Sequence, residues 1–146
     1  MTVLADVGQL RLEYSQFRLT GVERVDDDPS TLTFEPGVLV LLHVQQSGYA
    51  RVTATLGTMG EAPGEGWYGH QTHLVEAGSS VGIQTWEGER VAQFAVAPGR
   101  YRILRACRPA VITPVLELTS LKDRVATSRQ RIHFVALDSD QVQVPE

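Results

Sequence analysis

The sequence predicts an all-β protein, an antiparallel β-sandwich or jelly-roll-like barrel of about eight or nine strands with at most one short helix. Short runs of alternating or continuous apolar residues recur between glycine, proline, aspartate and serine residues along the whole chain. Most intervals between these runs are of hairpin length, whereas parallel neighbours need crossovers of about a dozen or more residues. No repeat of fixed period is present, which disfavours a solenoid or a propeller.

The first half of the chain contains four predicted strands, at residues 9–19, 31–34, 38–44 and 49–56. The alternation changes phase within the first of them, which indicates a bulge near Ser15 and Gln16. The third is apolar throughout and is expected to be a central strand. In the fourth, apolar residues alternate with Arg51 and two threonines, so one of its faces is expected to contact water.

The second half begins with the longest predicted loop, residues 57–66, whose four glycines, proline and two glutamates predict weak ordering. Further strands are predicted at residues 67–75, 80–86, 91–96, 100–106, 115–118 and 131–137, with 141–144 as a candidate edge strand. The turn at residues 87–90 makes a hairpin of the second and third of these strands. Residues 116–127 fit a helical period loosely but contain weak helix formers, so a short helix there is left open.

One all-β domain spanning residues 1–146 is predicted, because no linker divides the chain. Its net charge of −4 argues against nucleic acid and anionic membranes as partners. Cys107 is the only cysteine, which excludes an intramolecular disulfide. The sequence shows no signal peptide and no apolar run of the roughly 20 residues that cross a membrane. We therefore expect a cytoplasmic protein.

The sequence offers no motif for nucleophilic catalysis or phosphate binding in its required structural context, which favours a non-catalytic protein. Neither a nucleophile elbow nor a phosphate-binding glycine loop is predicted between a strand and a helix. Cys107 lies near Arg105 and Arg108, which could activate its thiol, but a small buried residue is the commoner role of a lone cysteine. We interpret Cys107 as a core residue, with a reactive thiol as the alternative.

The stretch Pro98-Gly99-Arg100-Tyr101-Arg102 resembles the strand-to-strand corner of immunoglobulin-like and fibronectin-type sandwiches. The resemblance implies a tyrosine corner, in which the Tyr101 hydroxyl bonds upstream backbone and the ring packs in the core. With Trp86 before it, the region is also similar to uncharacterised small bacterial β-sandwich proteins that share a tryptophan followed by PGxYR. That group implies a fold and no activity.

A second resemblance is to the first cupin motif, in which two histidines and a glutamate bind a metal. It is carried by Gly64, His70, Glu76 and Gly82. Thr72 stands where the family has its second histidine, and His73 is the nearest substitute. The resemblance implies one divalent transition metal on His70, His73 and Glu76, in a metal-dependent enzyme or a small-molecule sensor. On a regular strand, however, His73 points to the face opposite the other two, and the histidines are then polar residues beside the loop.

The leading hypothesis is a non-catalytic cytoplasmic β-sandwich, without a cofactor, that binds another protein. Arginines gather in two segments, at residues 100–108 and 124–131. If these segments are neighbours they form a basic patch suited to an acidic protein surface. A solvated strand face and a structural subunit of a larger assembly are the alternatives. The candidate partner-binding residues are Trp67, Tyr68, Arg100, Arg102, Arg129 and Arg131.

Overall fold

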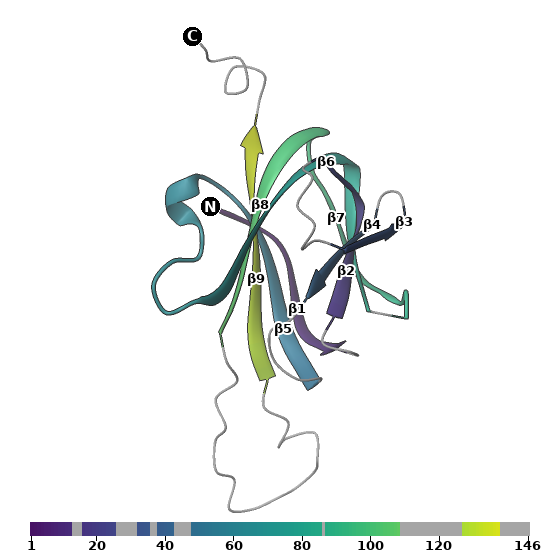
Figure 1. Cartoon of the computed structure of the whole chain (residues 1–146), viewed down its shortest axis with the longest axis vertical. Coiled ribbons are helices and arrows are strands. Elements are labelled where there is room, and N and C mark those ends of the chain that lie inside the picture. Colours follow the sequence, from purple (N-terminus) through teal and green to yellow (C-terminus); the bar gives the residue numbers. More distant parts are fainter. Residues whose placement is uncertain are drawn as a thin grey trace, which may run out of the picture.

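The computed structural model describes residues 1–12, 16–25, 32–35, 38–42, 48–85, 87–108 and 127–137. It confirms the all-β class, because nine strands form one curled sheet (Figure 1). The strands are β1 (Thr2–Leu12), β2 (Gln16–Arg24), β3 (Leu32–Glu35), β4 (Val38–Leu42), β5 (Gly48–Leu56), β6 (Tyr68–Thr85), β7 (Arg90–Ala95), β8 (Gly99–Arg108) and β9 (Thr127–Leu137). One helical turn, η1 (Met59–Glu61), lies between β5 and β6. The strands predicted at residues 115–118 and 141–144 and the helix considered after residue 116 lie outside the described residues.

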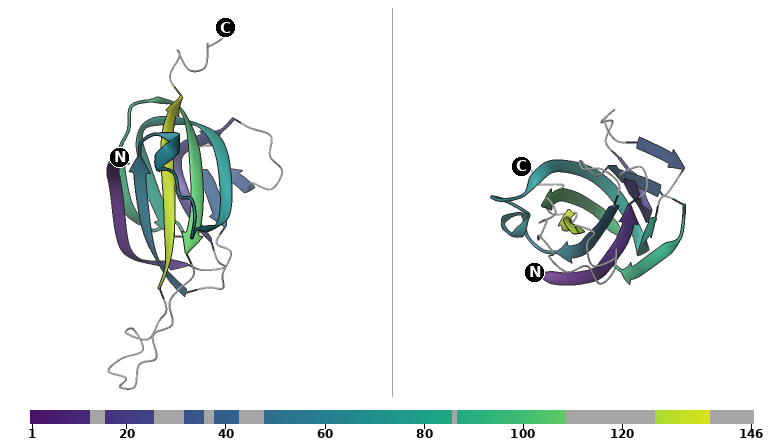
Figure 2. Two further views of the ribbon diagram at one scale, coloured as in Figure 1. Left: turned by 90° about the vertical axis from the view of Figure 1, so that its left-hand side faces the viewer. Right: turned by 90° about the horizontal axis from the view of Figure 1, so that it is seen from below.

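The sheet has the strand order β1-β5-β9-β8-β6-β2-β4-β3, and β7 pairs with β6. It curls until β1 approaches β7, and the strands seen from below surround a common core (Figure 2). Antiparallel pairing was expected throughout, and it holds for the described pairs except β5 with β9, which run parallel. A chain segment of more than a dozen residues separates these two strands, as a parallel pair requires.

Two strand boundaries differ from the prediction. Residues 9–19 were expected to be one bulged strand, but β1 ends at Leu12 and β2 begins at Gln16. β1 also begins at Thr2, seven residues before the predicted start at residue 9. Two register shifts against β5 interrupt the alternation of side chains, so this part of the strand could not be recognised from the sequence. The strands predicted at residues 67–75 and 80–86 are one continuous strand, β6, from Tyr68 to Thr85, because the glycine and serine residues between them lie within the strand beside a register shift against β2. Trp67 precedes this strand, and residue 86 lies outside the described residues.

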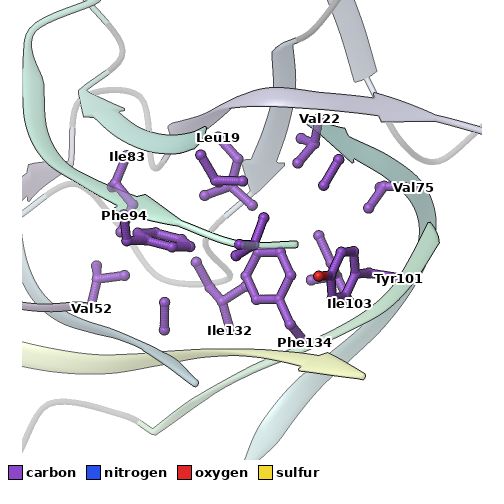
Figure 3. Close-up of a cluster of buried hydrophobic side chains, with 14 of the residues drawn as sticks. Leu19, Val22, Val52, Val75, Ile83, Phe94, Tyr101, Ile103, Ile132 and Phe134 are labelled. Atoms are coloured by element: carbon purple, nitrogen blue, oxygen red, sulfur yellow. The ribbon is translucent and has the colours of Figure 1, made fainter. Parts of the chain in front are cut away.

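The core lies on the concave side of the sheet and is built from alternate residues of each strand. Phe134 of β9 is at its centre, where its ring packs edge-on against Phe94 and Tyr101 with centroid distances of 5.9 and 5.8 Å (Figure 3). Around it lie aliphatic side chains from five other strands, including Leu19, Val22, Val52, Val75, Ile83 and Ile103. In β5, β8 and β9, the residues that alternate with the core residues face outward.

The tyrosine corner expected at Tyr101 is present. The Tyr101 hydroxyl donates a hydrogen bond to the carbonyl oxygen of Ala97, four residues upstream, with an O···O distance of 2.5 Å. The ring is buried, and burial raises the pKa of the phenol. This contact fixes the turn before β8 to the core.

Tyr101→Phe is expected to lower the free energy of unfolding by about 1 to 2 kcal/mol, because the Ala97 carbonyl loses its donor while the ring stays in place. Urea titration of the two proteins measures the difference. Tyr68→Phe is the matched control, because the Tyr68 side chain is exposed. Equal stability of the Tyr101 variant and the wild type would show that the corner bond contributes nothing.

Candidate functional site

Three arginines form a row on the outer face of the sheet. Arg51 of β5 is in register with Arg129 of β9, and Arg129 is in register with Arg108 of β8. Neighbouring strands lie about 4.8 Å apart, so the three side chains leave the sheet side by side. We call Arg51, Arg129 and Arg108 the arginine row.

The two outer members of the row are engaged with neighbouring groups. Arg51 donates two hydrogen bonds to the Asp6 carboxylate on β1, at 3.1 and 2.7 Å, and this bidentate contact holds the pKa of Asp6 below its usual value. Arg108 donates to the Gly66 carbonyl at 3.3 Å and lies 5.3 Å from the centroid of the Trp67 ring. Arg129 is exposed and forms no hydrogen bond or ion pair with any described residue.

A pocket of about 290 Å³ opens beside the row. Arg51, Arg129 and Arg131 supply its charged wall, and Met1, Val3 and Trp67 supply apolar surface. Met1 and Val3 are unusually exposed for apolar residues, at 64% and 58%. The remaining lining residues are Thr53, Thr55 and Gln130. The site therefore combines guanidinium groups with an uncovered apolar surface.

The 57–67 loop crosses the outer face next to this pocket and is held by side chains of β8 and β9. His133 Nε2 lies 2.8 Å from the Thr58 carbonyl, and Arg131 donates to the Glu61 carbonyl at 2.5 Å. Arg108 holds the far end of the loop at Gly66. The composition of the loop predicted weak ordering. In the structure, side chains that are distant in the sequence form hydrogen bonds to its backbone and hold it in place. Figure 1 shows η1 and the chain's first residue together beside β9.

A capping arrangement shapes the first turn of this loop. The Thr58 backbone N–H donates to the Glu61 carboxylate at 2.9 Å, and the Met1 amino group lies 2.9 Å from the same carboxylate. These contacts, led by the backbone bond, lower the pKa of Glu61 to about 2. The Thr-Met-Gly-Glu sequence fits the capping-box pattern, a signal from which this turn could have been predicted.

His133 is the buried anchor of the loop. The Thr58 carbonyl requires a proton on Nε2, so in the neutral imidazole the Thr55 hydroxyl, 2.7 Å from Nδ1, donates to that nitrogen. Burial lowers its pKa from 6.5, the Thr58 carbonyl opposes the shift, and nearby Arg131 adds to it.

Stability is expected to fall as the pH drops below about 6.5, because the unfolded chain then protonates His133 more readily than the folded protein does. The His133→Gln variant lacks this titration and should lose less stability between pH 7.5 and pH 5. Urea titrations of both proteins at the two pH values measure the difference. Identical losses would contradict a depressed pKa at His133.

The structure divides the predicted partner-binding residues into two groups. Trp67, Arg129 and Arg131 line the pocket, and Tyr68 is exposed beside Trp67. The remaining two, Arg100 and Arg102, lie toward the opposite end of β8, where their register partners on β9 are Leu137 and Val135.

Sequence reasoning missed three features of the arginines. Arg51 joins the row only through the parallel β5–β9 pair, and Arg108 is not among the six predicted binding residues. Arg105 is not on the surface. Arg105 lies two residues after Ile103 and four after Tyr101, so it points to the same inner face of the sheet. This spacing in the sequence could have predicted that Arg105 is buried.

Arg105 is 1% exposed and forms a polar cluster inside the sheet. Its guanidinium donates two hydrogen bonds to the amide oxygen of Gln130, at 3.2 and 2.8 Å, and one to that of Gln71, at 3.1 Å. The bonds link β6, β8 and β9. Burial among neutral groups lowers the pKa of Arg105 to about 10. Cys107 is buried on the same strand, as expected for a core residue.

The three residues of the suggested metal site lie on different faces of β6. His73 is buried, whereas His70 and Glu76 are exposed on the outer face, as strand alternation predicts. His70 Nε2 donates to the Trp67 carbonyl at 2.9 Å, and Glu76 is in register with Arg100. Among the described residues, no group of three histidine, cysteine, aspartate or glutamate side chains could hold a metal ion.

Protein purified without chelator is expected to contain no stoichiometric zinc, iron, nickel or manganese, because ligands on opposite faces cannot bind one ion. Elemental analysis by mass spectrometry measures this. Near-stoichiometric metal that is lost in both His70→Ala and Glu76→Ala would contradict the expectation. His70→Ala should instead loosen Trp67, whose carbonyl loses its donor.

Two glycine patterns in the sequence resemble catalytic motifs without their structural context. Residues 64–69 read Gly-Glu-Gly-Trp-Tyr-Gly and lead into strand β6, where phosphate-binding loops lead into a helix. Residues 78–82 read Gly-Ser-Ser-Val-Gly and lie inside β6, where a nucleophile elbow needs a strand-to-helix turn. Ser80 accepts a hydrogen bond from Gln93 on β7 at 2.5 Å. Neither pattern supports catalysis here.

Comparison with known proteins relates this chain by fold alone. No protein-family model and no curated protein matches its sequence. Among solved structures, it resembles ComJ from Bacillus subtilis, an inhibitor of the DNA degrading activity of NucA, with a TM-score of 0.64 and 12% identity over 92% of this chain and 97% of ComJ. It also resembles the product of crocagin biosynthetic gene J, with a TM-score of 0.54 and 14% identity over 94% of this chain and all of the other. In the described part of the chain, no helix has the length and apolar character needed to cross a membrane.

Proposed function

We propose that this chain is a non-catalytic module that binds another protein through the arginine row, Trp67 and the pocket beside them. The observation that carries the proposal is the composition of this surface. Arginine and tryptophan are among the residues that contribute most to binding energy at protein interfaces, and here they surround a preformed pocket. In a chain of net charge −4, cations concentrated on one face also orient an approaching partner.

The likeness to ComJ supports this proposal without carrying it, because unrelated functions share folds. ComJ inhibits the DNA degrading activity of NucA, and its fold is similar to that of this chain. By analogy, the partner of this chain is an enzyme whose activity falls when the pocket face covers it. The cytoplasmic location expected from the sequence is part of the same proposal.

Site-specific photo-crosslinking in the source cells tests the proposal. A benzoylphenylalanine replaces Tyr68, which is 59% exposed next to Trp67, and in a control protein it replaces Glu87 in the exposed β6–β7 turn. We expect one defined protein adduct from position 68 and none of that identity from position 87. Activity of the captured protein is then measured with and without the chain.

Charge reversal supplies the matched comparison. Arg129→Glu should abolish the adduct at position 68, whereas Arg90→Glu on β7, an equal change of charge at an exposed arginine, should leave it intact. Absence of a defined adduct at position 68, or the same adducts from both positions, would refute the proposed binding surface.

A further inference from the structure

The charge and the apolar surface of the pocket indicate which kind of protein segment it binds. This inference rests on the function proposed above. Arg129 stands between two other arginines, and like charges in register on neighbouring strands repel. Asp6 balances one of the three charges, through Arg51. The face therefore carries an excess of positive charge, and Arg129 offers its N–H donors to a ligand.

The apolar part of the pocket restricts the ligand further. Met1 and Val3 are exposed and Trp67 is half-buried, and all three line the pocket together with Arg129. A free inorganic anion would satisfy the arginine and leave this apolar surface in water. The pocket volume of about 290 Å³ is at the lower end of the range for small-molecule pockets, about 300 to 1,000 Å³, and gives room for one or two side chains.

Nucleic acid is disfavoured as the occupant by charge and shape. Duplex binding is driven by many phosphate contacts, whereas this chain has a net charge of −4 and one short row of arginines. The apolar wall of the pocket would find no apolar counterpart in a phosphate backbone. A protein segment, in contrast, can supply a carboxylate and an apolar side chain within a few residues.

We infer that the pocket receives an acidic segment of the partner protein, with an aspartate or glutamate carboxylate on Arg129 and a neighbouring apolar side chain against Val3 and Trp67. A guanidinium and a carboxylate form paired, charge-assisted hydrogen bonds, as Arg51 and Asp6 do on the same face. The apolar side chain excludes water from this contact.

The anchored loop prepares the pocket for such a ligand. His70 fixes the Trp67 carbonyl at 2.9 Å, and Arg108 holds both the Trp67 ring and the Gly66 carbonyl. Trp67 is thereby positioned before binding, which reduces the conformational entropy lost when the ligand arrives.

A random library of twelve-residue peptides displayed on phage tests the inference. The library is selected on the wild-type protein and depleted on Arg129→Glu, and we expect enrichment of an acidic residue within two positions of a leucine, isoleucine, phenylalanine or tryptophan. The strongest peptide is then synthesised with its acidic residues intact and as the asparagine or glutamine analogue. Fluorescence anisotropy should show at least tenfold weaker binding of the analogue to the wild type.

Variants distinguish the pocket from general attraction. Arg129→Glu should weaken binding of the acidic peptide at least tenfold, and Arg90→Glu should change it less than twofold. Replacing the apolar residue of the peptide with serine should also weaken binding. Enrichment of neutral or basic peptides, equal binding of the amide analogue, or displacement of the peptide by a twelve-nucleotide single-stranded DNA or by inorganic phosphate at millimolar concentration would overturn the inference.

The two proposals fail in different ways. If position 68 yields a defined adduct but the peptides show no acidic preference, the binding module stands and the acidic segment is wrong. If position 68 yields no defined adduct, the proposed function is wrong whatever the peptides show.

Discussion

Replacing Phe134 with alanine is expected to destabilise the protein by about 3 to 5 kcal/mol. Phe134 is fully buried at the centre of the core and packs edge-on against Phe94 and Tyr101 (Figure 3). Truncation removes both aromatic contacts and leaves a cavity between strands that hydrogen bonds hold apart. Because the sheet cannot close around the void, the effect should fall in the upper part of this range.

Phe134→Leu is the matched comparison for this prediction. It keeps most of the buried apolar volume and loses the aromatic pairs, so its cost should be less than half that of the alanine variant. Urea titrations monitored by circular dichroism give both values. A cost below about 1 kcal/mol for Phe134→Ala would show that the core at this position repacks, contrary to the expectation.

Gly21→Ala is expected to destabilise the protein by at least about 2 kcal/mol. Gly21 of β2 has φ of +80°, in the left-handed region that residues with a side chain rarely adopt. A Cβ atom there would also meet the carbonyl oxygen of Ser80 in the neighbouring strand β6. Backbone would therefore have to move on one strand or the other.

Gly8→Ala is the control for this substitution. Gly8 lies in β1, where an added Cβ has nothing within 4 Å, so the variant should have nearly wild-type stability. Thermal unfolding of the two variants and the wild type separates the effects. Equal melting temperatures for Gly21→Ala and Gly8→Ala would show that the close approach of β2 to β6 is not required.

Much of the fold could be predicted because side chains alternate along a half-buried strand. Alternation located β5 and β8 closely, since their inward and outward residues largely alternate, and the turn before β7 helped to locate that strand. It failed where the backbone is irregular. The register shifts of β1 break the alternation, and β6 contains glycine and serine, the residues of turns, inside a strand that shifts register against β2.

The candidate site was predictable only in part, because it combines local and long-range information. The arginines near Arg108 and Arg129 were visible in the sequence, and Trp67 was visible at the end of the loop. The addition of Arg51 depends on a parallel pairing that no local pattern encodes. Arg105 could have been placed inside by its parity with Tyr101, but its charge suggested the surface.

The position of β9 in the sheet has a consequence for the protein during its synthesis. β9 separates β5 from β8 and begins at Thr127, 71 residues after β5 ends at Leu56. Until the ribosome has released this strand, the nascent chain presents two unpaired strand edges, one on β5 and one on β8. Open edges of this kind recruit other chains. A translation product that stops before residue 127 would therefore aggregate, even though it contains eight of the nine described strands.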